Sequence, residues 1–366
     1  MTSGERDGAY MRAAVRLAAR GRGRTAPNPC VGALVVRAGR VIARARTADG
    51  GAPHAEARAL ARAGAAARGA TLYVTLEPCA HFGRTPPCVD AVVAAGVRRV
   101  VVGLVDPDPR TAGRSIRTLR RAGVKVAVGV EGAACAELHE GFVSRVTRGR
   151  PFTTLKLAAT LDGRIATARG DSRWISGERA RAFVHALRAR SDAVAVGSRT
   201  VLTDDPELTA RRGGRVVHRP IRIAVDGALR TPPAARLLDR ARPGSAWLLT
   251  SSDAAARRRA RLEAAGARVI AVPRKRGRLD LASAWRALGR LGVNDLLVEG
   301  GGELAAALLR AGLVDRMHFF LAPLLIGGDG RAVLGALGVE RLAAAVRPSR
   351  VSWRRLGPDL HAIAEW

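Results

Sequence analysis

The sequence predicts two successive α/β domains. The chain has 366 residues, which is more than one hydrophobic core of ordinary size usually serves. Strand-like apolar runs alternate with helical stretches throughout, the pattern of strands covered by helices. A short polar joint from Thr147 to Pro151 interrupts this pattern. We therefore expect one domain over residues 1–147 and a second over residues 151–366.

The first domain begins with a predicted helix over residues 7–20, where apolar side chains recur at helical spacing. Strands at 33–36 and 41–45 should then form a hairpin at Gly39. The remaining elements are predicted as helix 55–67, strand 71–76, helix 89–95, strand 97–102, helix 115–122, strand 124–128 and helix 137–146.

The second domain repeats the α/β alternation without repeating the sequence. A turn at Asp162-Gly163 separates its first two strands. Its predicted elements are strands 152–158 and 164–168, helix 177–190, and strands 193–196, 222–225, 246–250, 268–272, 295–299 and 316–321.

The charge of the chain is strongly positive, with 62 basic against 31 acidic residues. Except for Lys125, Lys156 and Lys275, the basic residues are arginines, and they are spread along the whole chain. Nucleic-acid binders concentrate such charge and interleave it with aromatic residues, which make up only 4% here. We expect a phosphorylated small-molecule substrate and cofactor, and no nucleic-acid partner.

Targeting and redox signals predict a cytoplasmic protein. No apolar run reaches the length of a membrane span, and the first residues lack the apolar centre of a signal peptide. Hence we expect no membrane contact. The cysteines are Cys30, Cys79, Cys88 and Cys135, and in a reducing compartment they should not form disulfides.

A candidate metal site stands out between residues 54 and 88. His54, Cys79 and Cys88 supply one imidazole and two thiolates. Tetrahedral zinc held by three protein ligands keeps a fourth position for water, which is the catalytic arrangement. Taken singly, each residue is better explained structurally, since free cysteines are usually small core residues. Together they predict zinc.

Glu56 follows His54 by two residues, so its carboxylate can reach metal-bound water without binding the metal. The order His-x-Glu, then Pro-Cys, is typical of zinc deaminases, in which the glutamate moves protons. Those enzymes usually separate the two cysteines by two residues, whereas eight residues separate Cys79 from Cys88.

Two loops are weaker candidates. Asp106-Pro107-Asp108-Pro109 follows a predicted strand, where α/β proteins gather ligands, but it suits a rigid connector equally well. Gly300-Gly301-Gly302 lies between a strand and a helix, a favourable seat for phosphate, yet a plain glycine-rich connector competes with that interpretation.

The chain resembles the bifunctional deaminase-reductase family of riboflavin biosynthesis over nearly its full length. The eight-residue gap between the cysteines is typical of that family. The motifs that carry the resemblance are Pro27-Asn28-Pro29, His54-Ala55-Glu56, Thr75-Leu76-Glu77-Pro78-Cys79, His81, Gly83-Arg84-Thr85-Pro86-Pro87-Cys88, Asp106-Pro107, Lys156-Leu157-Ala158, Leu161-Asp162-Gly163-Arg164, Trp174-Ile175, Arg188-Ala189-Arg190-Ser191-Asp192, Thr200-Val201-Leu202, Asp204-Asp205-Pro206 and Glu299-Gly300-Gly301.

The resemblance implies a cytidine-deaminase-like α/β/α sandwich followed by a dihydrofolate-reductase-like α/β domain. It implies that zinc-dependent hydrolysis removes the ring 2-amino group of 2,5-diamino-6-(5-phosphoribosylamino)pyrimidin-4-one. NADPH then reduces the ribosyl group of the product to ribityl.

The resemblance also implies roles for particular residues. Zinc would be held by His54, Cys79 and Cys88, with Glu56 catalytic. NADPH would contact Ala158, Trp174, Thr200, Asp204, Gly301, Gly302, Glu303, Leu304, Ala305, Ala306 and Ala307. The substrate would contact Ser172, Arg188, Leu208, Arg211 and Glu299, with the arginines on its phosphate.

The chain departs from the family pattern at four positions. Thr47 replaces a usual histidine, Asp108 an asparagine, Gly302 a proline, and Gly227 a serine that commonly meets the cofactor. None of these removes a metal ligand or Glu56, so they bear on affinity more than on reaction type.

Two alternatives compete with this interpretation. A zinc-dependent nucleic-acid base deaminase would use the same motif and the positive charge. A nucleic-acid-associated protein with a structural zinc would need a fourth protein ligand, for which His81 is the nearby candidate. We also expect the chain to form a homo-oligomer, either a dimer or a tetramer.

Overall fold

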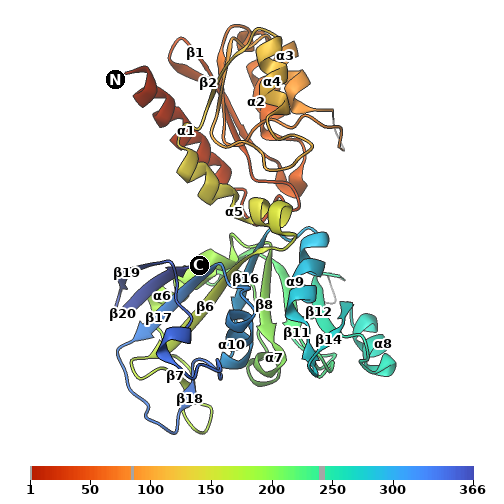
Figure 1. Cartoon of the computed structure of the whole chain (residues 1–366), viewed down its shortest axis with the longest axis vertical. Helices are drawn as coiled ribbons and strands as arrows, with labels where there is room; N and C mark the ends of the chain where they lie inside the picture. Colours follow the sequence, from red (N-terminus) through yellow and green to blue (C-terminus); the bar gives the residue numbers. More distant parts are fainter. Residues whose placement is uncertain (1, 84–85, 239–243) are drawn as a thin grey trace. The chain divides into compact units, whose positions relative to one another are not determined.

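The computed structural model describes residues 2–83, 86–238 and 244–366, which form two compact units, Met1–Arg150 and Pro151–Trp366 (Figure 1). Within those residues, no helix combines the length and the apolar character that crossing a bilayer requires.

Unit 1 is built on a five-stranded sheet of order β2-β1-β3-β4-β5. β1 pairs antiparallel with β2 and β3, whereas β3, β4 and β5 are parallel. The elements are α1 (Ser3–Ala19), β1 (Gly32–Arg37), β2 (Arg40–Arg46), η1 (Asp49–Gly51), α2 (Ala55–Ala63), η2 (Gly64–Ala67), β3 (Thr71–Val74), α3 (Cys88–Ala94), β4 (Arg99–Val102), α4 (Arg114–Arg121), β5 (Lys125–Val128) and α5 (Gly132–Arg148).

Both faces of this sheet are covered, which explains why its strands are almost wholly apolar. Leu34 and Val36 of β1 pack with Met11 of α1 on one face. Their neighbours Ala33 and Val35 belong to the other core, which includes residues of α2 and α3. In Figure 1, α1 and α5 lie side by side, while α2, α3 and α4 cover the opposite face. Unit 1 is therefore an α/β/α sandwich.

Unit 2 is built on a nine-stranded sheet of order β13-β12-β11-β8-β16-β6-β17-β20-β19. It is parallel from β13 to β17 and antiparallel over its last two pairings. The strands of this sheet are β6 (Phe152–Thr160), β8 (Ala193–Gly197), β11 (Ile221–Val225), β12 (Ala246–Ser251), β13 (Ala267–Val272), β16 (Asp295–Glu299), β17 (Arg316–Ala322), β19 (Arg350–Leu356) and β20 (Asp359–Glu365).

Helices and short hairpins complete unit 2. The helices are α6 (Glu178–Arg188), α7 (Ser198–Asp204), α8 (Ala256–Ala264), α9 (Leu281–Arg290), α10 (Gly302–Arg310) and η3 (Leu342–Ala344). The short strands are β7 (Arg164–Ala166), β9 (Ala210–Arg212), β10 (Arg215–His218), β14 (Arg274–Lys275), β15 (Arg278–Leu279) and β18 (Arg331–Ala332).

The two faces of the sheet in unit 2 carry separate cores. Residues of α9 and α10 pack on one face around Trp285, whose indole N–H donates to Thr153 Oγ1 at 2.8 Å. Val201 of α7 and Leu262 of α8 pack on the other. The sequence thus places apolar side chains on both sides of each parallel strand, and the carboxyl ends of those strands meet at one edge.

The predicted alternation of strands and helices is present in both units, with different ends for some elements. The last helix of unit 1, predicted over residues 137–146, spans Gly132–Arg148 in the structure. The first two residues of the predicted polar joint are therefore helical, and the helix ends at Gly149, which has φ +67°. The hairpin β19–β20 was not predicted. Every residue of β19 is exposed or half-buried. Because the strand has no buried face, its sequence lacks the sustained alternation of apolar and polar residues from which strands are predicted.

Candidate active sites

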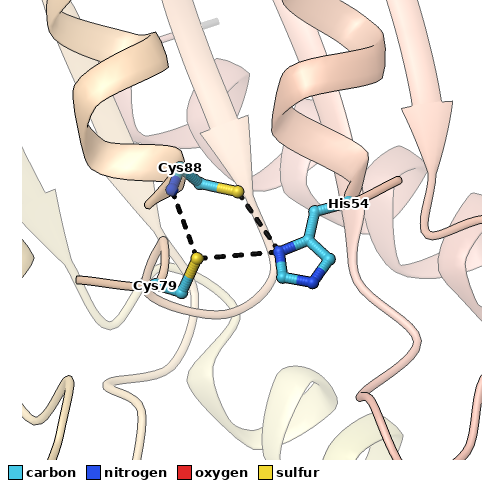
Figure 2. Close-up of side chains that lie close together, drawn as sticks. All are labelled: His54, Cys79 and Cys88. Atoms are coloured by element: carbon cyan, nitrogen blue, oxygen red, sulfur yellow. Dashed lines mark hydrogen bonds between the residues drawn. The ribbon is translucent and has the colours of Figure 1, made fainter. Parts of the chain in front are cut away.

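In unit 1, three segments bring the predicted metal ligands together. His54 is the N-cap of α2, Cys88 is the first residue of α3, and Cys79 lies in the loop after β3. Figure 2 shows the three side chains pointing toward one another. Their ligand atoms all lie within 4.8 Å of each other, and the group is partly to fully buried.

The spacing of these atoms fits tetrahedral zinc. Nδ1 of His54 lies 3.3 Å from Sγ of Cys88 and 3.6 Å from Sγ of Cys79. Zinc with ordinary Zn–N and Zn–S bonds separates neighbouring ligand atoms by about 3.5 Å. Among the described residues, this candidate group does not include His81, whose Nδ1 lies 3.2 Å from Thr111 Oγ1. The donor set therefore suits a catalytic site better than a closed structural one.

The surroundings of Cys79 lower the pKa of its thiol. Hydrogen bonding from the Cys88 thiol, together with His54 and the backbone N–H of Cys88, lowers the pKa of Cys79 to about 4. The backbone N–H of Cys88 lies 3.2 Å from Cys79 Sγ. The hydrogen bond between the two side chains also raises the pKa of Cys88, so the two cysteines share one proton before metal binds, and metal binding releases that proton.

Glu56 lies in the first turn of α2 with only 3% of its surface exposed. Burial raises its pKa to about 7. Its Oε2 has no hydrogen-bond partner among the described residues, which is rare for a buried carboxylate. A carboxyl group so placed can both take and release a proton near neutral pH.

The loop that carries Asn28 lies against the metal group. Asn28 Nδ2 donates to Gly51 O at 2.7 Å and lies 3.4 Å from His54 Nε2. Thr47 is only 1% exposed; its hydroxyl accepts from Val31 N and donates to Pro29 O. Thr47 therefore fastens this loop, which is the structural consequence of the departure at that position.

In the candidate ligand loop Asp106–Pro109, both aspartates are buried, whereas Pro109 is exposed. Burial raises the pKa of Asp106 to about 6, and its Oδ1 accepts the N–H of Asp108. Hydrogen bonding to Arg110 lowers the pKa of Asp108, which binds that guanidinium through both carboxylate oxygens. The extra negative charge at Asp108, where the family has asparagine, is thus neutralised by its neighbour.

In unit 2, a cavity of about 1260 Å³ opens where parallel strands end. Val196 and Gly197 of β8, Val225 of β11 and Glu299 of β16 line it, the usual ligand position in open α/β sheets. The predicted residues in its lining are Ala158, Ser172, Arg188, Thr200, Asp204, Leu208, Glu299, Gly301, Gly302, Glu303, Leu304 and Ala307.

Four predicted contacts lie outside this lining as the structure describes it. Ala305 and Ala306 are buried, and Ala305 belongs to the core that α10 forms with the sheet. Trp174 is 70% exposed, with its ring 4.9 Å from the guanidinium carbon of Arg181. Arg211 donates to Glu207 and to the carbonyl of Gly214. For these four, as for the residues that line the cavity, the implied role in binding stays a prediction.

A buried ion pair forms one wall of the cavity. Arg188 Nε and Nη2 donate to Glu299 Oε1 and Oε2 at 2.6 and 2.8 Å, and Nη1 donates to Thr209 O. Burial raises the pKa of Glu299, but the charge of Arg188 and its hydrogen bonds lower this pKa by more, so the net shift is downward. Burial lowers the pKa of Lys156, which lines the same wall. Two cations beside one carboxylate suit an anionic ligand.

No role was predicted for Lys156 or for the arginines of the cavity other than Arg188, among them Arg199, Arg230 and Arg274. Lys156 could have been predicted as a functional residue from the sequence, because lysine is rare in this chain and here interrupts an apolar strand. The arginines carried none in a chain so rich in that residue.

Two of the departures from the family pattern, Gly302 and Gly227, are glycines that line this cavity, and the space around them differs. A Cβ on Gly302 would lie 2.9 Å from Val333 O and 3.0 Å from Gly335 N, so the backbone there requires glycine. A Cβ on Gly227 would meet only Leu279 Cβ, at 4.0 Å. The wall at Gly227 therefore has room for a side chain that this protein lacks.

Comparison with known proteins decides the family. A family model described as RibD C-terminal domain matches residues 151–362, and one described as cytidine and deoxycytidylate deaminase zinc-binding region matches residues 4–104. Riboflavin biosynthesis protein RibD of Escherichia coli is 42% identical over 97% of this chain and 98% of its own length. The chain belongs to the RibD family.

Other members support this placement. RibD of Aquifex aeolicus is 39% identical over 97% of both chains. The structure of Acinetobacter baumannii RibD superposes with a TM-score of 0.89 at 36% identity, covering 99% of each chain. A Thermotoga maritima protein described as a diaminohydroxyphosphoribosylaminopyrimidine deaminase and 5-amino-6-(5-phosphoribosylamino)uracil reductase superposes with a TM-score of 0.83 at 32% identity, covering 100% of this chain and 99% of that one. The predicted fold class, a deaminase-like domain followed by a reductase domain, is confirmed.

Proposed function

We propose that this RibD family member catalyses two consecutive steps of riboflavin biosynthesis. The domain over residues 1–147 hydrolytically deaminates 2,5-diamino-6-(5-phosphoribosylamino)pyrimidin-4-one. The domain over residues 151–366 then reduces the ribosyl group of 5-amino-6-(5-phosphoribosylamino)uracil to ribityl with NADPH. The observation that carries this proposal is the group His54, Cys79 and Cys88 beside the buried carboxylate of Glu56, whose Oε2 has no hydrogen-bond partner among the described residues, in a chain that matches RibD relatives over nearly its full length.

In the deamination, His54, Cys79 and Cys88 would hold zinc, and Glu56 would move the protons. Zinc, when bound, lowers the pKa of water that it holds toward neutrality. The carboxylate of Glu56 would take one proton from the attacking water and pass it to the ring nitrogen, then carry the remaining proton of the new hydroxyl group to the departing amine as the carbonyl forms. One water is consumed and one ammonia leaves, with C–O formed and C–N broken. A pKa of about 7 suits Glu56 to both directions of transfer.

In the reduction, the chain binds and orients two ligands in one cavity. NADPH supplies the hydride. The cavity residues from β6, α7 and the start of α10 would hold the cofactor, and Ser172, Leu208 and the Arg188–Glu299 pair would hold the substrate. The implied contacts at Trp174, Ala305, Ala306 and Arg211 belong to the same proposal.

The proposal extends to compartment and assembly. Metal binding needs Cys79 and Cys88 reduced, which favours the cytosol. The edge strand β19 exposes Val351 and Trp353, which are 43% and 57% exposed, and this supports a homo-oligomer, a dimer or a tetramer, through unit 2.

Incubation of the zinc-loaded protein with the diaminopyrimidine ribotide tests the function. We expect stoichiometric ammonia without NADPH, and equimolar NADPH oxidation when the cofactor is added. Absence of ammonia from zinc-loaded protein would contradict the deaminase assignment. Ammonia without NADPH oxidation would contradict the reductase assignment alone.

A further inference from the structure

Glu77 is a buried carboxylate that the proposed chemistry does not use. It is 2% exposed and accepts four hydrogen bonds. Its Oε2 accepts from Asp106 N at 3.2 Å and from Gly113 N at 2.9 Å. Its Oε1 accepts from Ser115 Oγ at 2.8 Å and from Ile116 N at 3.3 Å. All four donors belong to one stretch of chain, the loop after β4 and the first turn of α4.

The start of α4 depends on this carboxylate. The N-cap residue of α4 is Gly113, which has φ +73° and no side chain to accept a hydrogen bond. The first N–H groups of a helix need acceptors from outside it. Glu77 supplies them from a distant segment, and its negative charge suits the positive end of the helix.

Glu77 also joins this loop to the metal ligands. It precedes Cys79 by two residues, and its own N–H donates to Leu104 O at 2.8 Å. Thr111, which lies in the loop after β4, places its Oγ1 3.2 Å from Nδ1 of His81. His81 follows Cys79 by two residues. The segment that supplies a metal ligand and the loop that carries Asp106 are thereby fixed to each other at three points.

We propose that Glu77 is a positioning residue for deamination, which holds the loop of residues 104–113 against the Cys79 segment so that the loop meets the pyrimidine ribotide. The inference rests on the proposed deaminase function. Glu77 touches neither metal nor substrate in this role; it acts through the loop.

Glu77→Gln in the full chain tests the proposal. Glutamine has nearly the same shape, but its NH₂ cannot accept a hydrogen bond. Facing Asp106 N and Gly113 N, the NH₂ loses both bonds; facing Ser115 and Ile116, it loses the Ile116 bond, because Ser115 Oγ can turn to accept from it. Either orientation therefore loses at least one of the four bonds, together with the negative charge. We expect the KM for the diaminopyrimidine ribotide to rise about 10–100-fold, because the variant loses at least one hydrogen bond and the charge that strengthens the others. The zinc-to-protein ratio should stay that of the wild type, because the ligand group itself is untouched.

Two controls separate positioning from stability. Asp7→Asn removes a comparable buried carboxylate in the same unit, one that binds Tyr73 and Arg99 and does not contact the loop. We expect it to lower the melting temperature and leave this KM unchanged. The reductase parameters, measured on the deaminated substrate, should be those of the wild type in both variants.

A KM for Glu77→Gln equal to that of wild type, or a loss of zinc, overturns the proposal. Where this variant does not fold, Ser115→Ala decides, since it keeps the carboxylate and removes one bond; we expect its KM to rise about 2–10-fold, the worth of one hydrogen bond, and an unchanged KM overturns the proposal. Failure of the proposed function is distinguishable, because the wild type itself would then release no ammonia.

Discussion

The two candidate sites differ in how much chain they need. The metal group of unit 1 consists of side chains at the starts of two helices and in the loop between them, all within residues 54–88. The cavity of unit 2 gathers residues from 156 to 335. A site built within a short stretch leaves a motif with definite spacing, whereas a site assembled from many strand ends leaves residues that mean little singly. The comparison also predicts separable chemistry, because the two sites share no residue.

The largest expected effect comes from Glu56→Gln. Removing the group that moves protons should reduce ammonia release about 10²–10⁴-fold, the usual worth of general acid–base catalysis. Zinc content, measured by metal analysis, should be unchanged, because His54, Cys79 and Cys88 remain. NADPH oxidation with the deaminated substrate should also be unchanged. A parallel fall in both activities would mean that the sites are not independent.

Arg188→Ala should act on unit 2 alone. It leaves Glu299 buried beside Lys156 without its bidentate partner, a loss that typically costs about 3–5 kcal/mol of stability. We expect a higher KM for the deaminated substrate and a lower melting temperature of unit 2, with ammonia release unaffected.

A matched control for that variant is Arg316→Ala. Arg316 is equally buried and pairs with Glu365, which also binds Arg350, outside the lining of the cavity. It should lose stability without a change in KM. Equal KM values for the two variants would remove Arg188 from substrate binding.

The response of unit 2 to acid should come from histidines away from its cavity. Burial lowers the pKa of His318 to about 3 and that of His361 to about 4. Their rings are joined by an N···N contact of 2.9 Å, and His361 stacks on Phe320. An unfolded histidine titrates near pH 6.5, so between about pH 4 and 6.5 the unfolded chain binds more protons than the folded one.

Stability should therefore be complete above pH 6.5 and decline as the pH falls toward 4. His361→Phe, which keeps an aromatic ring against Phe320, should make the melting temperature of unit 2 less dependent on pH in that window. The same slope in wild type and variant would show that His361 does not carry the effect.

The smallest expected effect concerns Gly227. Open space at this position admits a serine side chain, the residue usual in the family. One added hydrogen bond to the cofactor would lower the KM for NADPH about 2–10-fold. Steady-state kinetics measure this directly, with Gly328→Ser as the matched control, because Gly328 also has open space and no positive φ and lies outside the lining of the cavity. An unchanged KM would mean that a serine at this position does not reach the cofactor in this chain.

Much of the fold followed from sequence patterns, and the exceptions have physical causes. Parallel strands covered on both faces are continuously apolar, so β4, β8 and β12 were predicted from composition alone. β19 has one neighbour and no buried face, and its residues are indistinguishable from those of an arginine-rich loop. The end of α5 was predicted two residues early because Thr147 and Arg148 were assigned to the polar joint, whereas polar side chains do not end a helix and α5 continues to Gly149.

The sequence by itself predicted the candidate metal group and the proposed acid–base carboxylate, because a histidine and a glutamate two residues apart at a helix start, followed by two cysteines at a family-specific spacing, have few other uses. Only the tertiary structure decided which side of α10 faces the cavity, that Arg188 meets Glu299 across 111 positions, and that Glu77 caps a helix nearly forty residues away. The spacing of residues along one helix or strand determines which of its side chains point the same way. Contacts between distant segments depend on how sheets and helices pack, and no single stretch of sequence records that.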